Sequence, residues 1–253
     1  MKTVIITGAS RGLGAALSKH LMEKLGSLHL ISIARNANRD LKAIARQKRV
    51  KLDFIKADMA QTDTLEALME KVFACIDVEK VTGLYLVNNA GIVEPITPLA
   101  KMRTSDLEKN LAINLTAPMV LTAAFMHLSR RLRVEKRVVT ITSGASKRAV
   151  YGWSAYCSAK AGVNLFTACA AEEEKDKEFG VQLIAFSPGV MDTDMQATIR
   201  SSSQEDFKQL EDFVNFKKEG TLRPPAFVAE KLAEVLFTDH FPSGEFVDIK
   251  QLL

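Results

Sequence analysis

Three side chains between residues 143 and 160 are suited to binding a carbonyl oxygen and moving a proton. Tyr156 and Lys160 lie four residues apart in a segment with a helical pattern, so a phenol and an ammonium leave the same face about one turn apart. Ser143 follows residues 137–142, a β-branched run that predicts a buried strand. Because open α/β sheets bind ligands at the carboxyl ends of their strands, the sequence predicts a reaction site there.

A glycine-rich turn directly after the first predicted strand, residues 2–7, indicates a dinucleotide site. Gly8 permits a tight turn, Gly12 lets the backbone approach a pyrophosphate, and Gly14 allows the following helix to pack closely on the strand. The spacing is Gly-x-x-x-Gly-x-Gly, and by itself this motif leaves open a tight turn without a ligand.

The second predicted strand, residues 28–34, ends in Arg35-Asn36, about twenty residues beyond the glycines. An acidic residue at this position accepts hydrogen bonds from the ribose 2′-hydroxyl, whereas a basic one accommodates a 2′-phosphate. Arg35, with Arg11 as a second cation and Ser10 nearby, predicts NADP(H) as the cofactor. A solvated charge at a strand end is the alternative.

Polar groups at other positions have roles that the sequence leaves open. Asp58, before Met59 at the end of a strand over residues 50–57, could accept a hydrogen bond from the adenine amino group or cap the next element. The amides of residues 88–91 follow a strand at 83–87 and could bond local backbone or line a cofactor wall. Asn114, in an apolar context within a helix predicted over residues 104–131, needs partners and could be purely structural.

Strand and helix patterns alternate to the end of the chain. A strand over residues 181–186 precedes a polar region, 195–220, that we predict to be a mobile helical lid, then a helix from 225 to about 238 and a short strand at 244–248. No repeat or linker separates a second domain. We therefore expect residues 1–253 to form a single doubly wound Rossmann-type α/β domain, with a parallel sheet of about seven strands, helices on both faces, and residues 190–222 covering the substrate.

The composition is that of an ordinary globular protein, at 47% hydrophobic and 25% charged residues. The net charge of +4 arises from 34 basic and 30 acidic residues in mixed order, which predicts no nucleic-acid face. The three cysteines suggest no disulfide framework, the four dispersed histidines lack metal-ligand spacing, and the apolar run after Lys2 is too short for a membrane span. We expect a cytoplasmic protein without a metal.

Taken together, the motifs resemble the short-chain dehydrogenase/reductase family over essentially the whole chain. They occur in the family's order and spacing: Thr7-Gly8-Ala9-Ser10-Arg11-Gly12-Leu13-Gly14, Asn88-Asn89-Ala90-Gly91, Asn114, Ser143 thirteen residues before Tyr156, Tyr156-x-x-x-Lys160, and Ser187-Pro188-Gly189 followed by Thr193. The resemblance implies an NADP-dependent oxidoreductase that interconverts a carbonyl and an alcohol.

The same resemblance implies a catalytic tetrad of Asn114, Ser143, Tyr156 and Lys160. Ser143 would bind the substrate carbonyl oxygen, Tyr156 would donate the proton, and Asn114 would hold a water that links Lys160 to solvent. Lowering the phenol pKa from about 10 by roughly three units takes about 4 kcal/mol, which Lys160 and the positive nicotinamide ring of the oxidised cofactor could supply.

The family also implies which residues hold the cofactor. Lys160 would bind the nicotinamide ribose, and Thr193 with the Val190 backbone would bind the carboxamide. The full implied set is Gly8, Ser10, Arg11, Gly12, Leu13, Gly14, Arg35, Asn36, Asp58, Met59, Asn89, Ala90, Gly91, Tyr156, Lys160, Pro188, Gly189, Val190 and Thr193.

A narrower resemblance is to the sepiapterin reductase-like branch, and within it to bacterial benzil reductases that form (S)-benzoin. It is carried by Gly152-Trp153 before Ser154-Ala155-Tyr156-Cys157, by Val190-Met191-Asp192-Thr193-Asp194-Met195-Gln196 and by Ser243-Gly244-Glu245-Phe246-Val247-Asp248. It implies NADPH-dependent reduction of one carbonyl of an aromatic or apolar 1,2-diketone, with Ser143, Trp153, Tyr156, Met191 and Met195 at the substrate.

The sequence leaves alternatives open. A pteridine reductase of the sepiapterin type is the second reading. Sepiapterin reductases place an acidic residue near the C-terminus to anchor the pterin, whereas no carboxylate occurs around Lys250-Gln251. A non-catalytic NADP(H)-binding sensor is the third, and Trp153, Met191 and Met195 could be packing residues. The family also suggests a homodimer or homotetramer through the long helices after the fourth and fifth strands.

Overall fold

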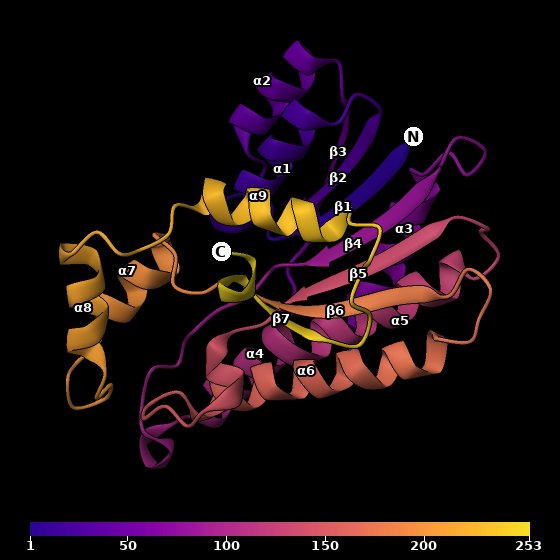
Figure 1. Cartoon of the computed structure of the whole chain (residues 1–253). Coiled ribbons are helices and arrows are strands. Elements are labelled where there is room, and N and C mark those ends of the chain that lie inside the picture. The colour runs from indigo at the N-terminus through magenta and orange to yellow at the C-terminus, as the bar shows by residue number, and fades with distance from the viewer.

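Seven parallel strands form one sheet in the computed structural model, which describes all 253 residues (Figure 1). The strand order is β3-β2-β1-β4-β5-β6-β7, so the order reverses between β1 and β4, and ligands bind at such a switch point in α/β sheets. The strands are β1 (Lys2–Thr7), β2 (Leu28–Ala34), β3 (Lys51–Lys56), β4 (Gly83–Asn88), β5 (Glu135–Ile141), β6 (Val181–Ser187) and β7 (Phe246–Asp248).

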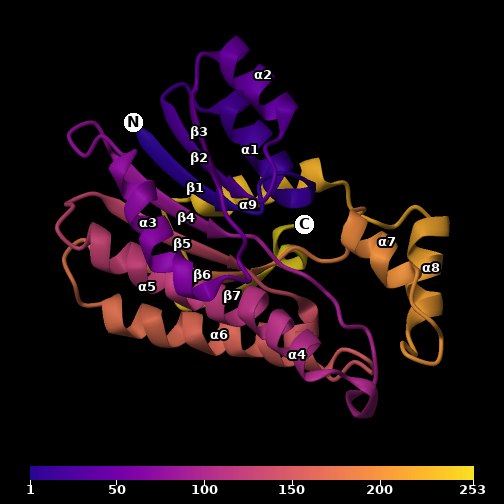
Figure 2. The ribbon, with the colours of Figure 1, turned by 180° about the vertical axis from the view of Figure 1, so that it is seen from behind.

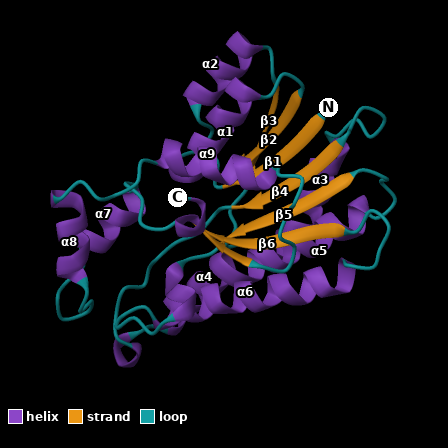
Figure 3. Ribbon diagram, in the orientation of Figure 1, coloured by secondary structure: helices purple, strands orange, loops and turns teal.

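Helices cover both faces of the sheet, which confirms the predicted doubly wound Rossmann-type fold (Figure 3). The central strands are continuous apolar runs because neither face meets water; Val4, Ile5 and Ile6 of β1 are fully buried. One face is covered by α1 (Gly12–Lys24), α2 (Arg39–Lys48) and α9 (Pro225–Leu236), and the other by α3 (Leu65–Ala74), α5 (Ala117–Ser129) and α6 (Ser154–Glu174).

The helix predicted over residues 104–131 is interrupted in its middle. It consists of α4 (Thr104–Leu111), a π-helical turn (Ala112–Thr116) and α5. Pro118 explains the interruption, because it has no N–H to donate to the carbonyl of Asn114 four residues earlier. The stretch Thr104–Ser129 is long and apolar enough to cross a membrane, yet Leu121 and Phe125 pack into the core, as in the core helix of a globular protein.

Two short helices, α7 (Asp194–Arg200) and α8 (Leu210–Lys218), project beyond the carboxyl ends of the strands in both views (Figures 1 and 2). They replace the single lid region predicted over residues 195–220. Their inner side belongs to a third apolar cluster, separate from the two clusters that cover the sheet, which also contains Trp153 and Tyr156. The lid helices therefore pack against the residues expected to do chemistry.

Candidate active site

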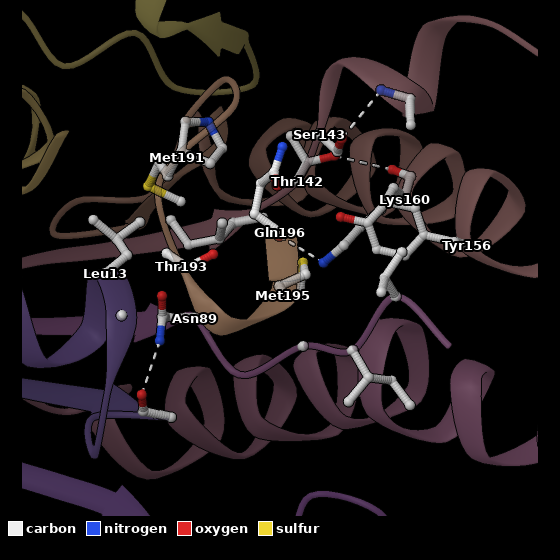
Figure 4. Close-up of a pocket in the computed structure, with 18 of the residues that line it drawn as sticks. Leu13, Asn89, Thr142, Ser143, Tyr156, Lys160, Met191, Thr193, Met195 and Gln196 are labelled. Atoms are coloured by element: carbon white, nitrogen blue, oxygen red, sulfur yellow. Dashed lines mark hydrogen bonds between the residues drawn. The ribbon is translucent and has the colours of Figure 1, made fainter. Parts of the chain in front are cut away.

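A single cavity of about 1410 Å³ lies at the carboxyl edge of the sheet and brings together nearly all the predicted site residues. In Figure 4, Ser143, Tyr156 and Lys160 lie at one end of the site, Leu13 and Asn89 at the other, and Thr193 between them. Only Gly14 and Asn114 of the predicted set lie outside the lining. The predicted residues in the lining are Gly8, Ser10, Arg11, Gly12, Leu13, Arg35, Asn36, Asp58, Met59, Asn89, Ala90, Gly91, Ser143, Trp153, Tyr156, Lys160, Pro188, Gly189, Val190, Met191, Thr193 and Met195.

The three polar groups at the reacting end are held by β5 and α6. Ser143 follows β5 by two residues, and its hydroxyl accepts a hydrogen bond from the Ala145 N–H (3.1 Å) and bonds to the Tyr156 side chain. Lys160, one turn further along α6, donates from Nζ to the carbonyl oxygen of Ile141 at the end of β5 (2.8 Å). The predicted neighbouring phenol and ammonium are therefore found, with the serine hydroxyl beside the phenol.

Burial controls the acidity of this pair. Burial raises the pKa of Tyr156 to about 12, although the hydrogen bond from Ser143 opposes the rise. Burial also lowers the pKa of Lys160 to about 8. Lys160 therefore does not by itself lower the pKa of the phenol toward neutral pH, which formation of the phenolate would require. The phenol is instead kept protonated at neutral pH, which is the state that a proton donor requires.

Asn114 lies next to Lys160 without reaching it. Its side chain is fully buried and uses both polar atoms on one neighbour, donating to the Ile92 carbonyl (2.8 Å) and accepting from the Ile92 N–H (3.1 Å). A Cβ on Gly91 would lie 3.0 Å from Asn114 Oδ1 and 3.6 Å from Lys160 Nζ, so Gly91 keeps the space between them open. The side-chain amide therefore bonds local backbone, and Pro118 has no N–H to donate to the backbone carbonyl of Asn114.

The glycine turn has the close contacts that its sequence predicts. Gly8 has φ +67°, and a Cβ there would lie 2.9 Å from the Ala90 Cα; a Cβ on Gly14 would lie 2.5 Å from the Gly8 carbonyl oxygen. Asn89 ties this turn to β4, since its amide donates to the carbonyl oxygens of Thr7 (2.9 Å) and Gly8 (3.2 Å). Asn89 therefore bonds local backbone while lining the cavity.

The lining on this side fits a phosphorylated dinucleotide. No side chain caps the first turn of α1, which leaves its N–H groups free for phosphate oxygens. Arg35 is exposed at the cavity and forms no ion pair, whereas Arg11 pairs with Asp194 at the start of α7 (2.9 Å). Asp58 accepts from the Ala60 N–H (3.0 Å), so one of its oxygens bonds the local turn backbone.

Several cavity residues on the substrate side were not predicted from the sequence. Phe213 and Phe216 of α8 line the cavity, and their signal was three phenylalanines in an otherwise polar segment, with two of them one helical turn apart. The turn after Ser143, β7 and the residues that follow β7 contribute further lining residues that were not predicted as site residues: Lys147, Arg148, Phe246, Asp248, Lys250 and Gln251.

Comparisons with known proteins agree with this geometry. Residues 2–204 match the model of the short chain dehydrogenase family. Benzil reductase ((S)-benzoin forming) of Bacillus cereus is 43% identical over 251 residues, covering 99% of this chain and 100% of the relative, and that of Bacillus subtilis is 39% identical over the full length of both.

More distant relatives share the same architecture. Sepiapterin reductase of Xenopus tropicalis is 27% identical over 252 residues, covering 96% of this chain and 94% of the relative. The crystal structure of the KRED1-Pglu enzyme has a TM-score of 0.84 at 25% identity, covering 98% of this chain and 100% of that one. These similarities confirm the predicted family and branch.

Proposed function

The chain belongs to the short-chain dehydrogenase family, and from that premise we propose that it is an NADPH-dependent reductase of one carbonyl group in an aromatic or apolar 1,2-diketone. Membership makes it an oxidoreductase with a nicotinamide cofactor, and its relatives at 43% and 39% identity support a carbonyl reductase. The benzil reductase names of those relatives support the diketone as substrate. The observation that carries the proposal is the Ser143–Tyr156–Lys160 group, which opens onto a cavity walled by Trp153 and the phenylalanines of α8.

The residues of this group divide the work of reduction. When bound, a nicotinamide cofactor would supply the hydride for the carbonyl carbon. Ser143 and Tyr156 bind the carbonyl oxygen, on which negative charge develops, and Tyr156 passes its proton to that oxygen to give the hydroxyketone. Lys160 stabilises the resulting phenolate by its charge, since its Nζ lies 5.8 Å from the centre of the phenol ring.

Return of the proton requires a link from Lys160 to solvent. We assign this role to a water bound to the backbone carbonyl of Asn114. The Asn114 side chain already bonds Ile92, and Pro118 has no N–H to donate to that carbonyl. The open space beside Gly91 separates this residue from Lys160. A water there would complete the relay that the family implies.

Preference for NADPH over NADH follows from the cations at the end of β2 and in the glycine turn. Arg35 is exposed at the cavity without a carboxylate partner, and Arg11 is held nearby by Asp194. An arginine can bind two phosphate oxygens at once, which a 2′-hydroxyl does not offer. The remaining predicted cofactor contacts, from Asn36, Met59, Pro188, Gly189, Val190 and Thr193, are consistent with their places in the lining.

We also propose that the protein works in the cytoplasm as a homodimer or homotetramer. Its three cysteines are free, as suits a reducing compartment. Large apolar side chains remain exposed on the two long helices, with Leu165 of α6 69% and Met119 of α5 37% exposed, which favours contact between copies there. The whole chain is one cofactor-binding unit in this proposal, with residues 190–222 over the substrate.

A pteridine reductase of the sepiapterin type is the second candidate. One observation favours it, because Asp248 places a carboxylate in the cavity lining near the C-terminus. That carboxylate is already engaged, since it accepts from the Ser187 hydroxyl (3.2 Å) and from the Lys250 N–H (2.9 Å). NADPH consumption with benzil and with sepiapterin, side by side, separates the two: faster turnover of sepiapterin would replace the diketone proposal.

A further inference from the structure

Aromatic rings from two distant parts of the chain pack together next to Tyr156. Trp153, just before α6, packs edge-on to the Tyr156 ring, with centroids 5.4 Å apart. On its other side Phe207 stacks on Trp153 at 4.8 Å and 19°, and Phe213 meets Trp153 edge-on at 5.5 Å. The cluster therefore runs without a break from α8 to the phenol that donates the proton.

Gly152 explains how the lid comes so close. It has φ +85°, and a Cβ there would lie 2.1 Å from the carbonyl oxygen of Asp206 and 3.6 Å from the Cα of Phe207. Only glycine allows the backbone of residues 206–207 to approach at this point. Lys101 also forms ion pairs with Glu205 and with Asp206 (3.4 Å for the latter), so the segment is fixed from a second direction.

The phenylalanines of the lid differ in what they face. Phe207 is fully buried and does not line the cavity, whereas Phe213 and Phe216 do line it and meet edge-on at 5.7 Å. Phe216 is only half-buried, and the residues that follow it in α8 are exposed and polar. Phe213 is buried, so the partly uncovered ring in this part of the lining is that of Phe216. Such a ring offers a contact worth about 0.5–1.5 kcal/mol to another aromatic ring, beyond the area buried.

We propose that α8 selects substrates that carry an aryl group. Phe213 and Phe216 receive the aryl group attached to the dicarbonyl, and Phe207 is a positioning residue that holds Trp153 in place between the lid and Tyr156. The inference rests on the proposed function and names the part of the chain that gives it aromatic selectivity. An aliphatic diketone fits the same catalytic group without using α8.

The first test compares two dicarbonyls that differ only in this respect, 1-phenylpropane-1,2-dione and butane-2,3-dione, with NADPH. In Phe213→Leu and Phe216→Leu we expect the ratio of kcat/KM for the phenyl substrate to that for the aliphatic one to fall about 2- to 10-fold, the equivalent of one lost aromatic contact. Phe227→Leu is the matched control, since Phe227 is half-buried on α9 away from the cavity, and its ratio should equal that of the wild type.

The outcomes separate this inference from the proposed function. Wild-type protein that reduces neither diketone contradicts the proposed function itself. Wild-type protein that reduces both, with an unchanged ratio in the two α8 variants, overturns only the role of α8. Phe216 is half-buried, so its variant remains informative even if Phe213→Leu fails to fold.

The second test uses Trp153, the single tryptophan of the chain, as a reporter without any turnover. We expect benzoin, the proposed product, to change Trp153 fluorescence saturably, and Phe207→Leu to raise the benzoin concentration needed severalfold. The same variant should raise KM for the phenyl substrate more than it lowers kcat. Loss of folded protein alone would lower kcat at unchanged KM, and that result, with unchanged benzoin binding, would overturn the positioning role of Phe207.

Discussion

Lys160 and Tyr156 lie side by side without a hydrogen bond between them: Lys160 Nζ is 5.8 Å from the centre of the Tyr156 ring and donates to the Ile141 carbonyl oxygen at 2.8 Å. The partner of the phenol is Ser143. Lys160 therefore has no direct bond to the phenol, and its bond to the end of β5 fixes where its ammonium lies.

Removal of the phenol hydroxyl in Tyr156→Phe should lower kcat for diketone reduction about 100- to 10,000-fold, because the proton donor is lost. NADPH binding, measured by energy transfer from Trp153 to the cofactor, should persist. Tyr151→Phe is the control, since Tyr151 is exposed and outside the cavity lining. Activity within tenfold of the wild type in Tyr156→Phe would be inconsistent with the assigned role.

Lys160→Met should abolish activity yet stabilise the fold. Burial lowers the pKa of Lys160 from 10.5 to about 8, so holding its ammonium inside the folded protein costs about 3 kcal/mol at pH 7. Allowing about 1 kcal/mol for the lost bond to Ile141, we expect the free energy of unfolding to rise by about 2 kcal/mol in urea titrations at pH 7.

The stability gained in Lys160→Met should decrease as the pH rises. Between pH 8 and 10.5 the unfolded wild type binds the extra proton, so wild-type stability rises with pH and the advantage of Lys160→Met shrinks. Lys42→Met, at an exposed lysine without an ion pair, serves as the control with little change. A variant less stable than the wild type at pH 7 would refute the assignment of a costly buried ammonium.

The rate of reduction should fall as pH rises. Tyr156 stays protonated because its pKa is raised to about 12, but Lys160 loses its charge near its pKa of about 8. We expect kcat/KM for the diketone to be level below about pH 7 and to fall about tenfold per unit above about pH 8. A rate that increases from pH 7 to 10 would show that another group limits the reaction.

Arg35→Asp should reverse cofactor preference. Hydrogen bonds to a charged group contribute about 1.5–3 kcal/mol, so the ratio of kcat/KM for NADPH to that for NADH should fall about 10- to 100-fold or more. Arg39→Asp, an exposed arginine nearby that does not line the cavity, should leave the ratio unchanged. An unchanged ratio in Arg35→Asp would remove Arg35 from the 2′-phosphate site.

Local sequence patterns were sufficient to predict the strands of the sheet and the proximity of Tyr156 and Lys160. Buried strands are continuous apolar runs, and each predicted strand agrees with the structure within two residues at either end. The close contact of Gly14 with the Gly8 carbonyl oxygen was predictable because it lies within the strand-turn-helix unit, whereas the contact of Gly8 with Ala90 comes from the loop after β4. Tyr156 and Lys160 share a helix face by spacing alone.

Features that depend on distant residues were not predictable. Asp194 pairs with Arg11 across 183 positions, and Phe207 stacks on Trp153 only because Gly152 admits the lid backbone. The pKa of Tyr156 depends on its burial, which no spacing reveals. The π-helical turn at Asn114 did have a local signal, Pro118 four residues later, which the apolar pattern concealed.

The central claim is tested most directly by the product formed from benzil and NADPH. We expect one benzoin per NADPH oxidised, with the (S)-enantiomer in excess by chiral chromatography, little reduction of the second carbonyl, and slower turnover with NADH. An absence of NADPH oxidation with benzil and with every other 1,2-diketone tried would contradict it.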